Sequence, residues 1–191
     1  MKKSFIKLFS AVLALTVFST PVFAEDNHEA EVKMLDSEIE KQSDNRFTQT
    51  TTYEIIIPAE NRNARGSITS NDNDSTISMQ ATLTSTYSKN ATNTALLLTD
   101  VSGSWKPLDT WTYIKKAKLV YGCSSLSLIE QTGVKYPTSS PFSYSTGFTK
   151  FVAIDGGSEV GARLTLTLAR GGSTWNFTLP SSVISNNLGL F

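Results

Sequence analysis

The side-chain types that carry most enzyme chemistry are scarce in this sequence. His28 is the only histidine and lies near the start of the chain, and Cys123 is the only cysteine. No Ser-His-Asp or Cys-His arrangement and no histidine-containing zinc site can be assembled after residue 28. A single cysteine forms no disulfide within the chain, and we interpret Cys123 as a small buried side chain. We therefore predict no catalytic residue, no metal site and no cofactor.

Carboxylates are the remaining side chains that could act in catalysis. Glycoside hydrolysis needs two of them at a defined separation. The candidates are Asp100, Asp109, Glu130, Asp155 and Glu159. Asp100 stands out because it lies at the end of an apolar run. Each of these acids is also consistent with an ordinary turn or surface position, which is the interpretation we favour.

The acidic run Asn71-Asp72-Asn73-Asp74-Ser75 offers oxygen atoms to a cation. A calcium loop of the EF-hand type needs a glycine at its sixth position and a later glutamate that binds through both oxygens. Both are missing here, so we predict a solvated turn.

Aromatic side chains are the strongest binding signal in the sequence. Trp105, Trp111, Tyr113, Tyr136 and Tyr144 cluster in the middle of the chain. A flat ring stacks on the apolar face of a pyranose, and exposed Trp and Tyr also serve protein interfaces. We predict Trp105, Trp111 and Tyr136 as ligand-binding residues, with Trp105 in a loop after Gly103-Ser104. The competing interpretation makes Trp105 a lid over an open end of the fold.

The clearest structural element is a hairpin over Val160–Leu179. Gly171-Gly172 supplies the positive φ angles of a two-residue turn, and an alternating run lies on each side of it. Folding the chain there places all large apolar side chains on one face. The predicted cross-strand pairs are Arg170–Ser173, Leu168–Trp175, Leu166–Phe177 and Leu164–Leu179. A less regular tail is expected from Pro180 onward.

Short alternating runs separated by turn-forming residues fill the rest of the chain. We expect strands at Thr50–Ile57, Ser75–Tyr87, Thr94–Val101, Trp111–Cys123, Leu126–Val134 and Phe142–Phe151. In the Trp111–Cys123 strand, one face is predicted to carry Trp111, Tyr113, Ala117, Leu119 and Tyr121. Lys115 interrupts this face and indicates a β-bulge. The pattern predicts an all-β fold, an antiparallel β-sandwich of immunoglobulin-like architecture with about seven to nine short strands.

Three segments are predicted along the chain. Residues 1–24 have a basic start, an apolar run and small residues at Val22 and Ala24, which predicts a secretory signal peptide cleaved after Ala24. Residues 25–46 are predicted as an acidic flexible leader in which a short amphipathic helix could form. Residues 47–191 are predicted as a single β-sandwich domain.

Charge narrows the range of partners. Removing Lys2, Lys3 and Lys7 from the 17 basic residues leaves 14 against 17 acidic residues, a net charge of −3. A nucleic-acid binder would need a strong basic patch, so no nucleic-acid partner is expected. No later segment is apolar for long enough to span a bilayer as a helix.

These features favour a secreted, non-catalytic domain that binds an extracellular ligand, either a glycan or a protein. Three alternatives stay open. One is a carbohydrate-binding module that uses exposed aromatic rings. The second is a membrane-active β protein, because Ser75–Val101 alternates like a pore-forming stem. The third is an enzyme that acts on glycans through paired carboxylates.

Overall fold

The computed structural model describes residues 30–57, 77–125 and 129–184, which form β-strands and no helix. The predicted signal peptide, its cleavage site and the Asn71–Ser75 turn lie outside these residues. The ten strands are β1 (Glu31–Lys41), β2 (Arg46–Ile56), β3 (Ile77–Lys89), β4 (Ala95–Pro107), β5 (Tyr113–Ser124), β6 (Glu130–Lys135), β7 (Phe142–Ser145), β8 (Val152–Ala153), β9 (Glu159–Arg170) and β10 (Ser173–Ile184).

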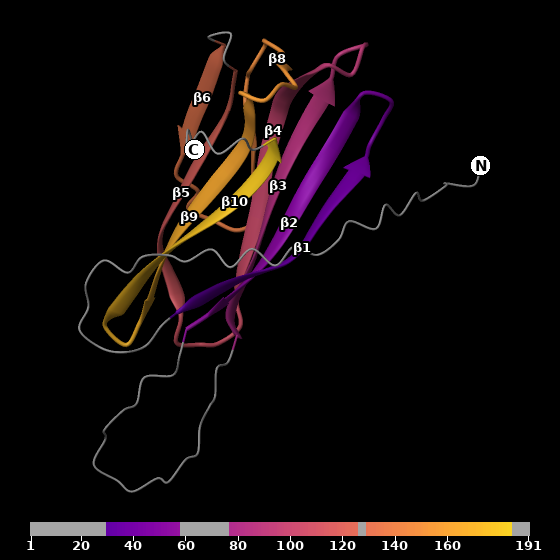
Figure 1. The fold of residues 1–191 in the computed structure, drawn as a ribbon. Coiled ribbons are helices and arrows are strands. Elements are labelled where there is room, and N and C mark those ends of the chain that lie inside the picture. Colours follow the sequence, from indigo (N-terminus) through magenta and orange to yellow (C-terminus); the bar gives the residue numbers. More distant parts are fainter. Residues whose placement is uncertain (1–29, 58–76, 126–128, 185–191) are drawn as a thin grey trace, which may run out of the picture.

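The strands form two antiparallel sheets that face each other (Figure 1). The first has the order β1-β2-β3-β4-β7, with β8 also paired to β4, and the second has the order β10-β9-β5-β6. Four consecutive strands thus form a meander in one sheet before the chain crosses to the other. The all-β prediction is confirmed, and the arrangement is compatible with a β-sandwich. No helix in the described part of the chain is long and apolar enough to cross a membrane.

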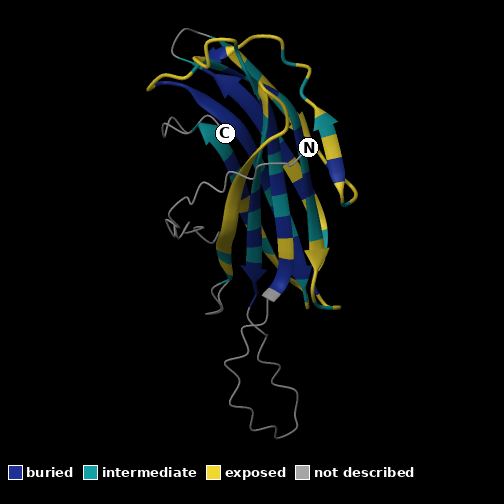
Figure 2. Ribbon diagram, turned by 90° about the vertical axis from the view of Figure 1, so that its right-hand side faces the viewer, coloured by how far each residue is buried: buried dark blue, intermediate teal, exposed yellow. Residues whose placement is uncertain are grey.

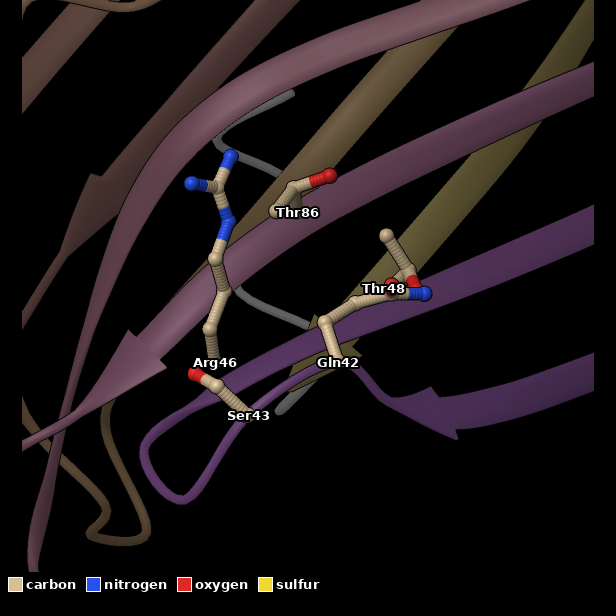
Figure 3. A pocket seen from close by; sticks show the side chains of 5 residues that line it. All are labelled: Gln42, Ser43, Arg46, Thr48 and Thr86. Carbon is tan, nitrogen blue, oxygen red and sulfur yellow. The ribbon is translucent and has the colours of Figure 1, made fainter. Parts of the chain in front are cut away.

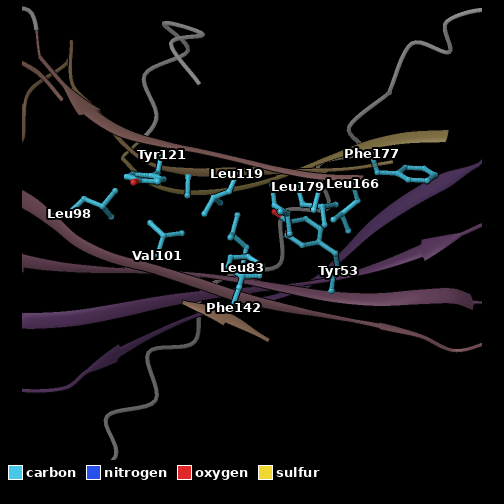
Figure 4. Close-up of a cluster of buried hydrophobic side chains, with 14 of the residues drawn as sticks. Tyr53, Leu83, Leu98, Val101, Leu119, Tyr121, Phe142, Leu166, Phe177 and Leu179 are labelled. Carbon is cyan, nitrogen blue, oxygen red and sulfur yellow. The ribbon is translucent and has the colours of Figure 1, made fainter. Parts of the chain in front are cut away.

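One hydrophobic core lies between the sheets (Figure 4). Buried residues alternate with more exposed ones along many of the strands (Figure 2), as expected for strands with one dry face. Both sheets contribute fully buried side chains, among them Ile55, Leu83, Leu98 and Val101 from the first and Leu119, Leu164, Leu166 and Phe177 from the second.

The β9–β10 hairpin has the register that the sequence predicts. Leu168 pairs with Trp175 and Leu166 with Phe177, and the turn glycines Gly171 and Gly172 have φ angles of 59° and 100°. The irregular tail expected from Pro180 does not begin there, however, since strand β10 continues to Ile184. Pro180 fits within it because β10 is an edge strand, where a missing N–H need not break a ladder between two neighbours.

The structure differs from the expected leader over Glu31–Lys41. This segment forms neither a solvated coil nor a short helix but strand β1, which pairs with β2 along its whole length. The side chains of β1 bury little surface, so the strand is held mainly by its backbone hydrogen bonds to β2. Met34, Leu35 and Ile39 are 41%, 44% and 61% exposed. Charged residues along β1 make this sheet edge a poor template for aggregation.

The bulge expected at Lys115 is present, since the β5–β9 register shifts between Ile114 and Lys116. The extra residue reverses the alternation of the strand on one side of it. Ile114 therefore packs against the core, whereas Tyr113 is 60% exposed. The prediction that Tyr113 shares the apolar face of Ala117 is corrected accordingly, because that prediction carried one alternation through the bulge.

Candidate functional site

An open groove of about 490 Å³ lies between the end of β4, the start of β5 and the segment that follows β6. Its ten lining residues combine aromatic, aliphatic and basic side chains and include no acidic one. They are Trp105, Pro107, Tyr113, Ile114, Lys115, Lys116, Ala117, Tyr136, Pro137 and Thr138. Two of the three predicted ligand-binding residues, Trp105 and Tyr136, thus line one surface depression.

Trp105 lies in strand β4 rather than in the loop that the sequence suggests. Gly103, two residues before Trp105, also lies in β4 and not in a turn. A Cβ at Gly103 would lie 2.6 Å from the Thr82 carbonyl oxygen and 2.7 Å from the Phe142 ring. The glycine lets β4 pass close to that ring. Trp105 is half-buried against the core, and its ring centroid lies 5.6 Å from that of Phe142. It therefore forms a fixed wall of the groove.

Ser140 fixes the backbone of Trp105 from both sides. The Trp105 N–H donates to the Ser140 hydroxyl oxygen at 2.8 Å, and that hydroxyl donates to the Trp105 carbonyl oxygen at 2.8 Å. The Ser140 side chain thereby satisfies both the N–H and the carbonyl group of Trp105, next to the point where β4 pairs with β7. This contact holds the segment before β7 against the strand that carries the tryptophan.

The opposite wall carries two exposed tyrosines. Tyr136 is 58% exposed and follows β6, while the next residue, Pro137, is buried and anchors the segment. The Lys116 Nζ atom lies 5.7 Å from the centroid of the Tyr136 ring, a cation–π contact. Tyr113 points outward because of the bulge at Lys115. The bulge thus brings an aromatic ring and two lysines to the same wall.

Trp111, the third predicted ligand-binding residue, is 66% exposed but does not line the groove. It lies in the β4–β5 connection, whose conformation depends on Asp109. The Asp109 carboxylate accepts hydrogen bonds from the backbone N–H groups of Trp111 and Thr112 at 2.8 and 2.6 Å. Arg170 donates to the same carboxylate at 2.6 Å and to the Ile57 carbonyl oxygen at 3.1 Å.

These contacts change the acidity of Asp109. Partial burial raises the pKa of its carboxyl, but hydrogen bonds from Thr112 and Trp111 and the charge of Arg170 outweigh it and lower the pKa below its usual value. Asp109 is therefore ionised and fully engaged. Its role is to position the connection that leads into Tyr113 and the bulge.

The basic side chains of the groove form no ion pair with the residues that the structure describes. Lys115 and Lys116 line it, and Lys106 and Lys135 lie on adjoining strands. Within the described part of the chain, the ion pairs are Glu31–Lys33, Lys41–Asp44, Arg46–Asp100 and Asp109–Arg170. None involves a lysine of the groove. Lys135 instead lies 5.8 Å from the Tyr144 ring centroid.

A second depression of about 610 Å³ lies beside the β1–β2 turn (Figure 3). It is lined by Gln42, Ser43, Arg46, Thr48 and Thr86. Arg46 donates to Asp100 at 2.8 Å, which accounts for the carboxylate that stood out in the sequence. The charges of this depression neutralise each other, and no aromatic ring lines it.

The other carboxylates lie in different surroundings. Asp155 accepts hydrogen bonds from the Gly157 N–H and the Ser158 hydroxyl within a turn. Glu130 and Glu159 each pair with Ser124 from opposite sides of β5, which puts their Cα atoms about 10 Å apart, two strand spacings. Glu159 is only 5% exposed, however. The pair therefore does not offer two accessible carboxylates to a substrate.

Metal and thiol chemistry find no support in the described residues. No group of three or more His, Cys, Asp or Glu side chains there could hold a metal ion. Cys123 is fully buried, as predicted, and burial raises the pKa of its thiol to about 11. A thiol with so high a pKa is a poor nucleophile at neutral pH.

No protein-family model, curated protein or solved structure matches this chain. The sequence pattern included Tyr113 in the aromatic cluster but placed it on the face of Ala117, and it did not single out Lys116 or Pro137. The signal that could have found Tyr113 and Lys116 is the bulge at Lys115, because it changes which neighbours face outward.

Proposed function

We propose that this protein is a secreted, non-catalytic binding protein whose ligand site is the groove between Trp105 and Tyr136. The observation that carries the proposal is the gathering of three aromatic rings, those of Trp105, Tyr113 and Tyr136, on one groove that contains no carboxylate. The walls are tied to both sheets through the Ser140 and Asp109 contacts. A site held in this way is preorganised for a ligand rather than formed on binding.

The shape and lining of the groove favour a carbohydrate as the ligand. Its volume is within the range of ligand sites, about 300–1,000 Å³. Because the groove is open, it suits a segment of a longer chain better than a small molecule that must be enclosed. The exposed faces of Tyr113 and Tyr136 offer flat apolar surfaces on which sugar rings stack.

The membrane-active alternative is weakened by the place of the β3–β4 hairpin. Its apolar face, which includes Ala81, Leu83 and Leu98, is buried against the second sheet. Releasing this hairpin would expose much of the core.

The strand connectivity differs from the immunoglobulin-like one that the sequence suggests. Immunoglobulin domains do not keep four consecutive strands in one sheet, whereas β1, β2, β3 and β4 are neighbours in the first sheet.

Binding to a panel of insoluble and soluble polysaccharides, with Tyr113→Ala and Tyr136→Ala as variants, tests the proposal. We expect binding to at least one polysaccharide and about a tenfold loss of affinity for each variant, roughly 1.4 kcal/mol. Phe151→Ala is the matched control, because Phe151 is an exposed aromatic residue (39%) that does not line the groove. Absence of binding to every polysaccharide, or equal binding by the tyrosine variants and the control, would refute the proposal.

A further inference from the structure

We infer that the ligand of the groove is an anionic glycan, a sugar polymer that carries regularly spaced acidic groups. The inference rests on the proposed function and specifies its ligand class. It depends on the charges of the lysines around the aromatic rings.

The first observation is that the positive charge of the groove has no partner in the described structure. Lys115 and Lys116 are consecutive residues at the β5 bulge and reach the groove together. Their nearest carboxylate along the strand connection is Asp109, which is held by Arg170 at 2.6 Å. Two ammonium groups without a counter-charge favour an anion that approaches from solvent.

The second observation is the uneven distribution of charge between parts of the fold. Residues 30–57, which form β1 and β2, carry six acidic and three basic residues, whereas residues 77–125 and 129–184 carry five acidic and nine basic ones. The acidic strand β1 is three strands away from β4 in the sheet. That separation is about 14 Å, beyond the screening length of about 8 Å at physiological ionic strength. The acids of β1 therefore do little to cancel the lysines of the groove.

The third observation is the combination of lysines with ring faces. The Lys116 ammonium lies beside the face of Tyr136 at 5.7 Å, so one ligand can meet a ring and a positive charge at the same time. A sugar that carries an acidic group fits both, because its apolar ring face can stack on the tyrosine and its anion can contact the lysine. Lysine provides a compact point charge on a flexible stem, which accepts either a carboxylate or a phosphodiester.

A single-stranded nucleic acid also combines anions with stacking rings. The glycan is favoured because the groove sets three aromatic rings beside only two lysines, Lys115 and Lys116, whereas a nucleic-acid site needs a strong basic patch. The nucleic acid therefore enters the test as a competing outcome.

The test compares polymers that differ in charge. Polygalacturonate and its fully methyl-esterified form share one backbone, and a polymer of sugar units linked by phosphodiesters supplies the phosphodiester arm. We expect an acidic polymer to bind at least about tenfold more tightly than the ester, with affinity falling as salt rises. Binding of one acidic arm alone identifies the carboxylate or the phosphodiester as the recognised group.

The variants separate the groove lysines from charge in general. The double variant Lys115→Gln/Lys116→Gln should lose about tenfold or more of the affinity for the acidic polymer. Lys89→Gln/Lys150→Gln is the control, because it removes the same charge outside the groove and Lys89 likewise lies beside an aromatic ring, 4.7 Å from the Phe47 centroid. Equal losses in the two double variants would overturn the inference.

Two further outcomes separate this inference from the proposed function. Equal binding of the ester and the acid, lost in Tyr136→Ala, would overturn the anionic ligand and leave the aromatic glycan site standing. Binding to no polysaccharide would overturn both. Tighter binding of a single-stranded oligonucleotide than of any acidic glycan, sensitive to the groove lysines, would replace the glycan with a nucleic acid.

Discussion

The hairpins β1–β2 and β9–β10 have antiparallel ladders of similar length, but their first strands bury their side chains very differently. In β9, Leu164, Leu166 and Leu168 are completely buried. In β1, every residue except Val32 is exposed. A strand can therefore form a complete backbone ladder while burying almost none of its side chains. The comparison indicates that backbone hydrogen bonds are enough to form a strand, whereas side-chain packing stabilises the fold.

The position of each strand in its sheet explains the difference. β9 lies between β10 and β5 and faces the first sheet, whereas β1 is an edge strand. The contacts of β10 with β2 and β3 place it opposite those strands, so β1 extends beyond the second sheet. Ile39 pairs with Gln49, whose side chain reaches the Ser182 carbonyl oxygen at 3.1 Å. The described part of the second sheet thus ends near Gln49 and leaves Ile39 in solvent.

The largest effect is expected from truncating the buried ring of the β9–β10 hairpin. Phe177 is 1% exposed, and Phe177→Ala removes its contacts and leaves a cavity that close-packed neighbours fill only in part. We expect a loss of about 3–5 kcal/mol in the free energy of unfolding. Urea denaturation followed by fluorescence measures it. A loss below about 1 kcal/mol would show that the packing of this hairpin is not what stabilises the fold.

The same contrast explains which strands could be predicted. The β9–β10 register followed from the sequence because its alternation coincides with a buried face and a Gly-Gly turn fixes the pairing. Alternation in β1 is interrupted by the register shift between Met34 and Asp36, and its apolar residues stay exposed. Hydrophobic periodicity reports burial, so it does not reveal a strand that is held by its backbone alone.

An intermediate effect is expected from the ion pair that holds the β4–β5 connection against the end of β9. Asp109→Asn removes the charge that Arg170, the last residue of β9, holds against the β4–β5 connection. Breaking this largely buried pair should cost about 1–3 kcal/mol at pH 7. Asp44→Asn is the control, because Asp44 pairs with Lys41 in full solvent exposure and should change stability by less than about 0.5 kcal/mol.

The pH dependence sharpens this test. The folded-state pKa of Asp109 is lowered, so its contribution to stability is complete above its unfolded pKa of about 3.9. The contribution is lost as the pH falls through the folded-state value. The stability difference between the wild type and Asp109→Asn should therefore be constant near neutrality and shrink below about pH 4. A difference that grows on acidification would contradict the assigned ion pair.

The groove was predictable only in part, for reasons that lie in particular residues. The aromatic cluster pointed to Trp105 and Tyr136, and Lys115 indicated the bulge. The direction of Tyr113 was wrong because one extra residue reverses the alternation on its side of the bulge. Trp105 was expected in a loop because Ser102-Gly103-Ser104 resembles a turn, whereas Gly103 is required by the approach of the Phe142 ring. Such close approaches between distant residues leave no local pattern in the sequence.

The smallest effect is expected from a β-branched side chain in the exposed strand β1. Ile39→Thr keeps the branch at Cβ that favours a strand and removes only apolar surface that is already 61% exposed. We expect a change within about 0.5 kcal/mol in the free energy of unfolding. The matched substitution in the other hairpin, Val160→Thr, places a hydroxyl at a fully buried site and should cost about 1–3 kcal/mol. If Ile39→Thr instead cost as much as Val160→Thr in urea denaturation, β1 would contribute to stability through its side chains. The distinction between a ladder that forms a strand and packing that stabilises the fold would then fail for this hairpin.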